Sequence, residues 1–147
     1  MSFTRSITID APIDQVFRVI SRYEYAVEKL DHIIDLKLNQ DKVTEGTKMT
    51  ETRHIKGQNV NNTWEVIEYE PNQRFVVKSE QNKLYLTYRY TFVEHDGQTT
   101  VNFDGNITTS GLRNLIYKPL IKKIIIKEDG EHLNKVKAYI EELNESK

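Results

Sequence analysis

A few polar residues fall on a strand face that is otherwise apolar, and they are the residues of this chain best suited to chemistry. Counting from the predicted turns assigns six of them to that face: Glu51, Arg53, Asn62, Ser79, Tyr88 and Tyr90. A charge in a dry core is costly unless it is paired. Glu51 and Arg53 are two residues apart on one strand face, so they either pair with each other or both point into a wet space.

Two interpretations of this polar set are open. In the first, Glu51 and Arg53 belong to the polar end of a ligand cavity. In the second, the hairpin tip that carries them overhangs the body of the protein, and both charges are solvated. Tyr88 and Tyr90 are likewise either cavity groups or core aromatics with satisfied hydroxyl groups. Gly105, opposite Tyr88, leaves room for a ring in both cases.

The sequence has no motif of metal-dependent, nucleophilic or nucleotide-dependent catalysis. Its four histidines are His32, His54, His95 and His132; none has the spacing of metal ligands, and there is no cysteine. His54 falls on the outer strand face. We predict that His95, beside a turn, and His132, on the polar side of the last helix, are solvated. With no G-x-S-x-G, P-loop or G-x-G-x-x-G motif either, we expect no metal site and no cofactor.

The pair Asp96-Gly97, between two alternating runs, is the strongest hairpin signal of the chain. As a turn, it predicts one apolar face with the pairs Phe92–Val101, Tyr90–Phe103, Tyr88–Gly105 and Leu86–Ile107. On the opposite face it predicts the pairs Arg89–Asp104 and Thr91–Asn102, which suit water. A slip of one residue would invert this pattern, so the agreement supports the register.

Three further turns extend the same apolar face. A turn at Gln81-Asn82 predicts the pairs Ser79–Leu84, Val77–Leu86 and Phe75–Tyr88. A turn at Pro71-Asn72 predicts Val66–Val77 and Trp64–Ser79. A turn at Gly57-Gln58 predicts Ile55–Val60, Arg53–Asn62, Glu51–Trp64 and Met49–Val66. Because all four turns agree on one buried face, they predict a curved sheet that encloses a partly polar cavity.

The segments around these hairpins predict helices and two more strands. Residues 3–10 and 33–39 alternate as strands, and we expect a second short helix over residues 23–30. The first helix follows Pro12, which suits a first turn, and its apolar side holds Val16, Phe17, Val19 and Ile20. Residues 112–144 predict a long C-terminal helix that Pro119 and Gly130 should kink or weaken. Its second half carries a single apolar stripe: Leu133, Val136, Ile140 and Leu143.

The first half of this helix, residues 112–126, is apolar on more than one side. Its apolar residues are Leu112, Leu115, Ile116, Leu120, Ile121, Ile124, Ile125 and Ile126. A ligand, a moving loop or a partner would have to cover them. The same region carries a basic cluster of Arg113, Lys118, Lys122, Lys123 and Lys127. This cluster suits contact with an anionic membrane surface, and a solvated helix edge near the cavity mouth is the simpler interpretation.

Length and composition fit a single domain over residues 1–147. The absence of cysteine excludes a disulfide-dependent scaffold. The first ten residues lack an apolar signal region, and no run approaches the ~18 apolar residues that a membrane span needs. We therefore expect a cytoplasmic protein. The formal net charge of −1 gives no general attraction to nucleic acid, and we expect no nucleic-acid partner.

The predicted order of elements is that of the helix-grip fold, an α+β fold in which a curved antiparallel sheet wraps around a long C-terminal helix. One strand comes first, then two helices, six strands and the final helix. Four features of the sequence are informative beyond this order: the run from Ile7 to Phe17, the run from Trp64 to Pro71, Arg74-Phe75 and the last helix. On these features the chain resembles the START-like (SRPBCC) superfamily over almost its whole length, and most closely its polyketide cyclase/dehydrase-like members. The resemblance implies this fold, and it carries over no catalytic residue.

We expect the protein to bind a small hydrophobic or lipid-like molecule between the sheet and the C-terminal helix, without catalysis. The expected ligand-binding residues are Glu51, Arg53, Asn62, Trp64, Phe75, Leu86, Tyr88, Tyr90, Phe103, Leu115, Ile116 and Leu120. One alternative is a polyketide cyclase/dehydrase-like enzyme that uses the cavity tyrosines, or Glu51 and Arg53, as acid, base or orienting groups. Another is a protein-interaction domain of the chaperone-activator kind, which would use the apolar face of residues 112–126.

Overall fold

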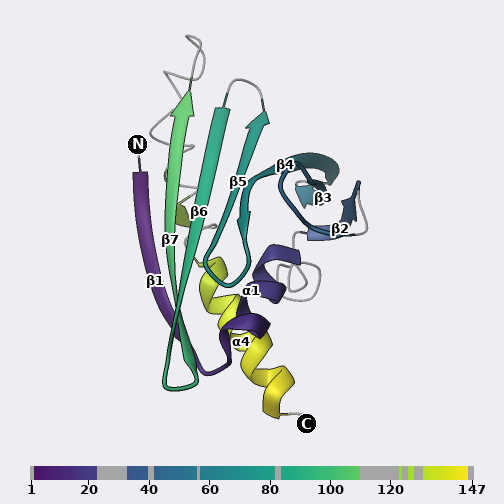
Figure 1. Ribbon diagram of the computed structural model, residues 1–147. Coiled ribbons are helices and arrows are strands. Elements are labelled where there is room, and N and C mark those ends of the chain that lie inside the picture. The colour runs from purple at the N-terminus through teal and green to yellow at the C-terminus, as the bar shows by residue number, and fades with distance from the viewer. Residues whose placement is uncertain are drawn as a thin grey trace.

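A seven-stranded antiparallel sheet forms the body of the protein in the computed structural model (Figure 1). The structure describes residues 2–22, 33–39, 42–55, 57–81, 84–109, 123, 126–127 and 131–145. In chain order, the elements are β1 (Ser2–Ile9), α1 (Ile13–Arg22), β2 (Ile33–Leu38), β3 (Lys48–Ile55), β4 (Gln58–Glu70), β5 (Arg74–Gln81), β6 (Leu84–His95), β7 (Gln98–Thr109) and α4 (His132–Glu145). The strand order in the sheet is β1-β7-β6-β5-β4-β3-β2.

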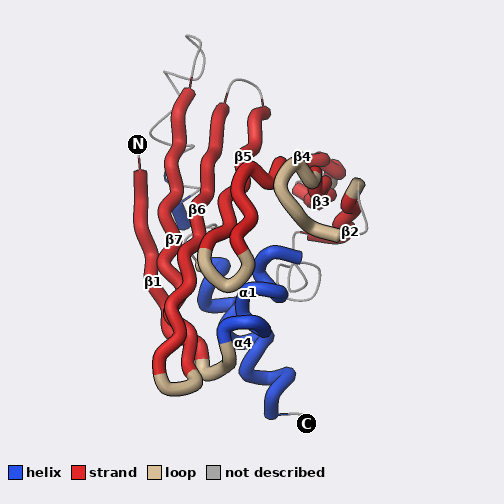
Figure 2. Tube along the Cα trace, viewed as in Figure 1, coloured by secondary structure: helices blue, strands red, loops and turns tan. Residues whose placement is uncertain are grey.

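The two described helices, α1 and α4, pack on the same face of the sheet, which we call the inner face. Phe17 of α1 packs edge-on against Phe75 of β5 and Phe92 of β6. At the start of α4, His132 packs against the ring of Phe103 of β7. β2, β3 and β4 curl away from the other four strands (Figures 1 and 2). The curved sheet around a C-terminal helix confirms the predicted helix-grip fold.

The predicted β6–β7 hairpin is confirmed pair by pair. Tyr90 faces Phe103, Tyr88 faces Gly105, and the other four predicted pairs are present as well. At the turn, Asp96 has a φ of 52° and Gly97 a φ of 80°. Two positive φ values give the turn a twist that matches the right-handed twist of the flanking strands. The Asp-Gly pair thus fixes both the turn and the register.

Two other predicted turns are each wrong by one residue. Ile55 pairs with Gln58, so the β3–β4 turn comes one residue earlier than predicted, and Arg53 faces Val60 while Glu51 faces Asn62. Gln81 pairs with Leu84, so the β5–β6 turn comes one residue later. Moving a two-residue turn by one position changes every pairing partner by two residues. Because strand faces alternate with a period of two, each side chain stays on its predicted face.

The β4–β5 hairpin differs from the prediction at both ends. Its turn takes three residues, closed by a hydrogen bond from the Gln73 N–H to the Glu70 carbonyl oxygen, 3.0 Å. The third turn residue shifts the pairing by one residue. A β-bulge between Val66 and Glu68 adds one residue to β4, which compensates for this shift and restores the predicted Val66–Val77 pair. The ladder then ends at Glu65–Lys78, one pair before the predicted Trp64–Ser79 pair. Beyond that point, β4 and β5 separate.

The predicted terminal elements are confirmed where the structure describes them. β1, α1 and β2 lie where the sequence predicts them, and Val16, Phe17, Val19 and Ile20 are buried. In α4, Val136 and Ile140 are buried, whereas Leu143 is 38% exposed and does not extend the buried stripe. The predicted short helix at residues 23–30 lies outside the described residues. So do Pro119, Gly130 and most of the predicted helix from 112 to 131.

Candidate ligand-binding site

A buried carboxylate is the centre of the polar groups on the inner face. The side chain of Glu51 is 0% exposed. Its Oε1 accepts hydrogen bonds from Arg53 Nε at 2.8 Å, Trp64 Nε1 at 3.1 Å and Asn62 Nδ2 at 3.3 Å. Arg53 Nη2 lies 2.7 Å from the same oxygen, and the Arg53 side chain is 16% exposed. We call Glu51, Arg53, Asn62 and Trp64 the Glu51 cluster.

The two oxygens of Glu51 are used very differently. While Oε1 collects all these donors, Oε2 is buried and meets no hydrogen-bond donor within the part of the chain that the structure describes. A buried acceptor without a donor costs about 1–3 kcal/mol. The carboxylate is therefore held firmly through Oε1, whereas Oε2 is an acceptor that no described residue uses.

Strand register explains how the Glu51 cluster forms. The β3–β4 ladder places Asn62 directly opposite Glu51 and places Trp64 one pair further along on the same face. Beyond the cluster, Ser79 of β5 donates a hydrogen bond from Oγ to Asn62 Oδ1, at 2.6 Å. This side-chain bond spans the region where the β4–β5 ladder has ended. The polar network thus crosses three strands, and at Asn62 and Ser79 it does so beyond the end of the β4–β5 ladder.

An aromatic layer adjoins the Glu51 cluster. The rings of Trp64 and Tyr88 lie 5.0 Å apart at an angle of 33°, and Tyr88 packs edge-on to Phe103 at 5.0 Å. Tyr90 contacts Phe103 at 5.0 Å and Phe75 at 5.9 Å. All five side chains are buried on the inner face. Aromatic side chains of this kind commonly line sites for apolar ligands.

The space above Gly105 is filled by a ring, as predicted, but the ring comes from the neighbouring strand. Phe3 of β1 pairs with Gly105. A Cβ atom built on Gly105 would lie 2.5 Å from Phe3 Cε1, so no larger residue fits there without a shift. Phe3 in turn packs edge-on against Tyr88 and Phe103. The glycine therefore lets β1 close one side of the aromatic layer.

A second polar group, which the sequence did not predict, lies in the same layer. The Tyr90 hydroxyl and His132 Nε2 are 2.9 Å apart. His132 is 5% exposed, so the prediction that it is solvated is wrong. It lies four residues before Val136 and eight before Ile140, so it continues the buried stripe of α4 toward the helix start. That spacing was the signal for its burial.

The predicted site residues fall into three groups. Trp64, Phe75, Leu86, Tyr88, Tyr90 and Phe103 are buried on the inner face. Glu51 is fully buried, so the alternative in which it is merely solvated is wrong, while Asn62 is half-buried and Arg53 reaches the surface with part of its side chain. Leu115, Ile116 and Leu120 lie outside the described residues.

Comparison with known proteins identifies the family. The model of the family described as polyketide cyclase/dehydrase and lipid transport matches residues 1–141. The chain belongs to this family. The description covers both polyketide chemistry and lipid transport, so membership is compatible with ligand binding and with aromatase or cyclase activity. No curated protein sequence matches the chain.

Solved structures with low sequence identity share the fold. A START superfamily protein from Mycobacterium smegmatis has a TM-score of 0.76 at 14% identity, over 97% of this chain and 98% of its own. The Zhui aromatase/cyclase from Streptomyces sp. R1128 has a TM-score of 0.73 at 11% identity, over 96% of this chain and 93% of its own. A norcoclaurine synthase from Thalictrum flavum has a TM-score of 0.74 at 13% identity, over 98% and 96%. These matches confirm the START-like fold.

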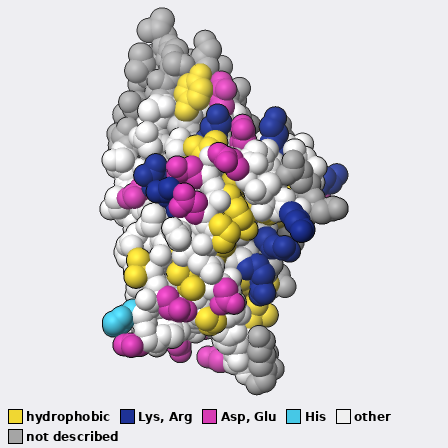
Figure 3. Space-filling view, in the orientation of Figure 1, with side chains coloured by type: hydrophobic (Ala, Val, Ile, Leu, Met, Phe, Trp, Pro, Cys, Tyr) yellow, Lys and Arg dark blue, Asp and Glu magenta, His cyan; other side chains and the backbone are white. Residues whose placement is uncertain are grey.

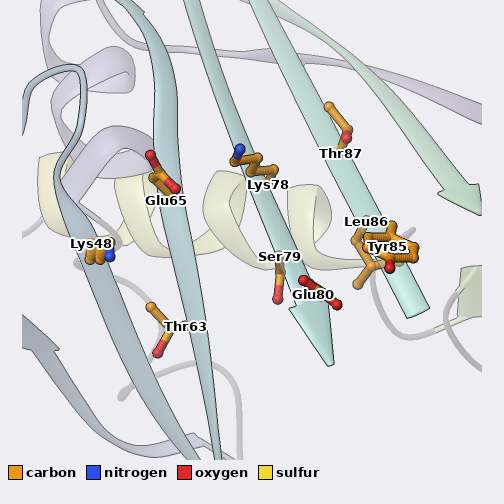
Figure 4. Close-up of a pocket in the computed structure, with 9 residues that line it drawn as sticks. All are labelled: Lys48, Thr63, Glu65, Lys78, Ser79, Glu80, Tyr85, Leu86 and Thr87. Atoms are coloured by element: carbon orange, nitrogen blue, oxygen red, sulfur yellow. The ribbon is translucent and has the colours of Figure 1, made fainter. Parts of the chain in front are cut away.

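A pocket of about 430 Å³ lies where β4 and β5 separate (Figure 4). It is lined by Lys48, Thr63, Glu65, Lys78, Ser79, Glu80, Tyr85, Leu86 and Thr87. Most of these residues alternate with the inner-face positions and point outward, whereas Ser79 and Leu86 belong to the inner face. With two lysines and two glutamates, the pocket is more polar than a site for an apolar molecule. Through Ser79 it adjoins the network of Glu51.

On the face shown in Figure 3, basic side chains gather along the right-hand side, whereas acidic side chains lie mainly to the left and along the lower edge. Among the described residues, no three histidine, aspartate or glutamate side chains gather as metal ligands. No described helix has the length and apolar character needed to span a bilayer.

Proposed function

We propose that the protein binds a small hydrophobic molecule between the inner face of the sheet and the C-terminal helical segment, without acting on it chemically. The observation that carries this proposal is the buried Glu51 carboxylate beside an aromatic layer, with one oxygen satisfied and the other without a donor among the described residues. Ligand sites combine a mostly apolar surface with a few fixed polar groups in this way.

The proposed site uses the residues expected from the sequence. Trp64, Tyr88, Tyr90, Phe75, Phe103 and Leu86 would contact the apolar part of the ligand, and Glu51, Arg53 and Asn62 would form the polar end. Leu115, Ile116 and Leu120, from the predicted helix, would cover the ligand on the other side. We expect no cofactor and no nucleic-acid partner.

Two measurements test binding. Native mass spectrometry of protein purified from its own host should reveal a retained small molecule. In a second measurement, the chain has only one tryptophan, Trp64, so energy transfer from it to an added anilinonaphthalene probe reports occupancy near the site. Tyr88→Ala should weaken probe binding, whereas Val93→Ala, at a position that is 57% exposed on the outer face, should not. Absence of both a retained molecule and probe binding would refute the proposal.

A second function is favoured by one observation. Tyr90 and His132 are two groups capable of proton transfer, 2.9 Å apart within a buried aromatic layer. General acid–base catalysis needs such groups within hydrogen-bond reach. We therefore propose, as the alternative, cyclisation or dehydration of an aromatic or polyketide-type substrate. Incubation with a poly-β-ketone analogue should then yield a cyclised product, and Tyr90→Phe should abolish turnover while leaving substrate binding intact.

The protein-interaction hypothesis rests on residues 112–126, most of which lie outside the described residues. A solid interior that binds no probe would favour it over both proposals above.

A further inference from the structure

The asymmetry of the Glu51 carboxylate indicates what kind of ligand the proposed site takes. Four donor atoms from Arg53, Asn62 and Trp64 converge on Oε1. Oε2 is equally buried, yet no donor from the described residues reaches it. Buried polar atoms are nearly always paired, and an exception calls for a missing partner such as a ligand or a water molecule.

We propose that Glu51 Oε2 accepts a hydrogen bond from a neutral hydroxyl or N–H group of the bound molecule. This inference rests on the proposed binding function and specifies its ligand class: a flat apolar molecule with a hydrogen-bond donor at one edge. Glu51 is then the residue that determines specificity at the polar end of the site.

The charge balance favours a neutral donor over a cation. Arg53 already neutralises Glu51 at 2.7 Å, so the pair carries no net charge. An ammonium group brought to Oε2 would leave an uncompensated positive charge in a region where Glu51 is 0% exposed. Burying an unpaired charge is far more costly than burying a hydrogen-bonded hydroxyl.

The surroundings of the carboxylate favour a ring as the apolar part. The indole of Trp64 donates to Oε1 and at the same time packs against Tyr88 with the two rings only 33° from parallel. An aromatic ligand seated along these rings would therefore lie next to the carboxylate. A hydroxyl on the near edge of such a ring supplies the missing donor.

Three probes of similar shape test the proposal: 2-naphthol, which has a donor, 2-methoxynaphthalene, which has only an acceptor, and naphthalene, which has neither. Binding of each to the wild-type protein is measured by isothermal titration calorimetry. Because a hydrogen bond to a charged group is stronger than one between neutral groups, wild type should prefer 2-naphthol to both other probes by about tenfold or more.

The variant Glu51→Gln makes the test sharper, since the donors around Oε1 fix the orientation of the new amide. Its carbonyl oxygen should take the place of Oε1, where Arg53, Asn62 and Trp64 donate. Its NH₂ group must then stand at the Oε2 position, which changes from acceptor to donor. We expect the preference for 2-naphthol to disappear and 2-methoxynaphthalene to bind at least as well. Binding of the ether by the variant also excludes a steric explanation for its rejection by wild type.

Glu65→Gln is the matched control. It removes the same charge from an outward-facing position of β4, outside the Glu51 cluster, and should keep the wild-type preference. If Glu51→Gln does not fold, as judged by circular dichroism, the preference of wild type among the three probes still decides the matter.

The outcomes separate this inference from the function on which it rests. If wild type binds all three probes equally, the proposed subsite is wrong, water is the donor to Oε2, and the binding function stands. If wild type binds none of the probes and purifies without a ligand, the binding function itself is wrong. An unchanged preference in Glu51→Gln would also overturn the role of Glu51.

Discussion

The inner face holds two buried polar groups that are built in different ways. The Glu51 cluster is ionic and lies within one layer, because all its members come from β3 and β4. The Tyr90–His132 pair joins two layers through a hydrogen bond between the sheet and the start of α4. We therefore expect the first group to stabilise the sheet where it curls, and the second to stabilise the docking of the helix. Loss of each should have a distinct signature.

The largest effect is expected from Glu51→Ala. It leaves the Arg53 guanidinium, the Trp64 indole N–H and the Asn62 amide without their common acceptor. Breaking a buried ion pair from one side costs about 3–5 kcal/mol. Because Arg53 still reaches solvent, we expect the free energy of unfolding, measured in urea, to fall by about 3 kcal/mol. The emission of Trp64 should shift at the same time. A loss below about 1 kcal/mol would mean that the cluster does not stabilise the curl.

A smaller decrease in the free energy of unfolding is expected from His132→Ala. Removing a buried ring leaves a cavity and takes away the partner of the Tyr90 hydroxyl. Together these effects should cost about 2–3 kcal/mol. Here the signature is faster amide hydrogen exchange in α4, with the emission of Trp64 unchanged. An equal increase in amide hydrogen exchange in β3 and β4 would contradict the view that the two polar groups stabilise different parts of the protein.

Tyr90→Phe should have a modest effect, since it removes one hydroxyl and keeps the ring contacts with Phe75 and Phe103. The loss of a single neutral hydrogen bond costs about 0.5–1.5 kcal/mol. Tyr88→Phe, in the same layer, serves as the comparison for removal of a tyrosine hydroxyl. Thermal unfolding of both variants measures the difference.

The smallest effect is the coupling between the two groups. A double-mutant cycle of Glu51→Gln and Tyr90→Phe should give free energies of unfolding that add within about 0.5 kcal/mol, as for sites that share no partner. Tyr88 and Phe103 link Trp64 of the Glu51 cluster to His132 in a chain of ring contacts. A coupling above about 1 kcal/mol would show that this chain of rings transmits strain, and the two groups would then have to be treated as one site.

The sequence predicted the sheet face of each strand residue more accurately than its partner on the neighbouring strand. Alternation along a strand assigns each side chain to a face whichever turn residue is chosen, so Glu51 and Tyr90 were placed on the inner face correctly. Gly57, with a φ of 77°, suits either position of a two-residue turn, and the turn was therefore misplaced by one residue. No local signal marked the bulge near Ile67, since it depends on how β4 bends.

The candidate site was harder to predict than the fold, for a physical reason. Periodicity shows that Glu51 and Arg53 share a face, but burial depends on which segments cover that face. Tertiary packing alone decides that Glu51 is enclosed while Arg53 reaches the surface. The prediction that His132 is solvated was wrong because it rested on the polarity of histidine and not on the four-residue spacing between His132 and Val136. In both cases, a polar residue on an apolar face was the informative signal.

The pairing of β1 with β7 has a consequence for how the chain folds. Phe3 pairs with Gly105, and Lys137 of α4 donates a hydrogen bond from Nζ to the Thr8 carbonyl oxygen at 2.7 Å. β1 therefore finds its partners only after about 100 further residues have followed it in the chain. The consecutive hairpins from β3 to β7 close over short distances, whereas β1 joins through the longest loop, and non-local pairing of this kind slows folding. After β1 and α1 have been synthesised, the core cannot close until β7 and α4 have been synthesised as well.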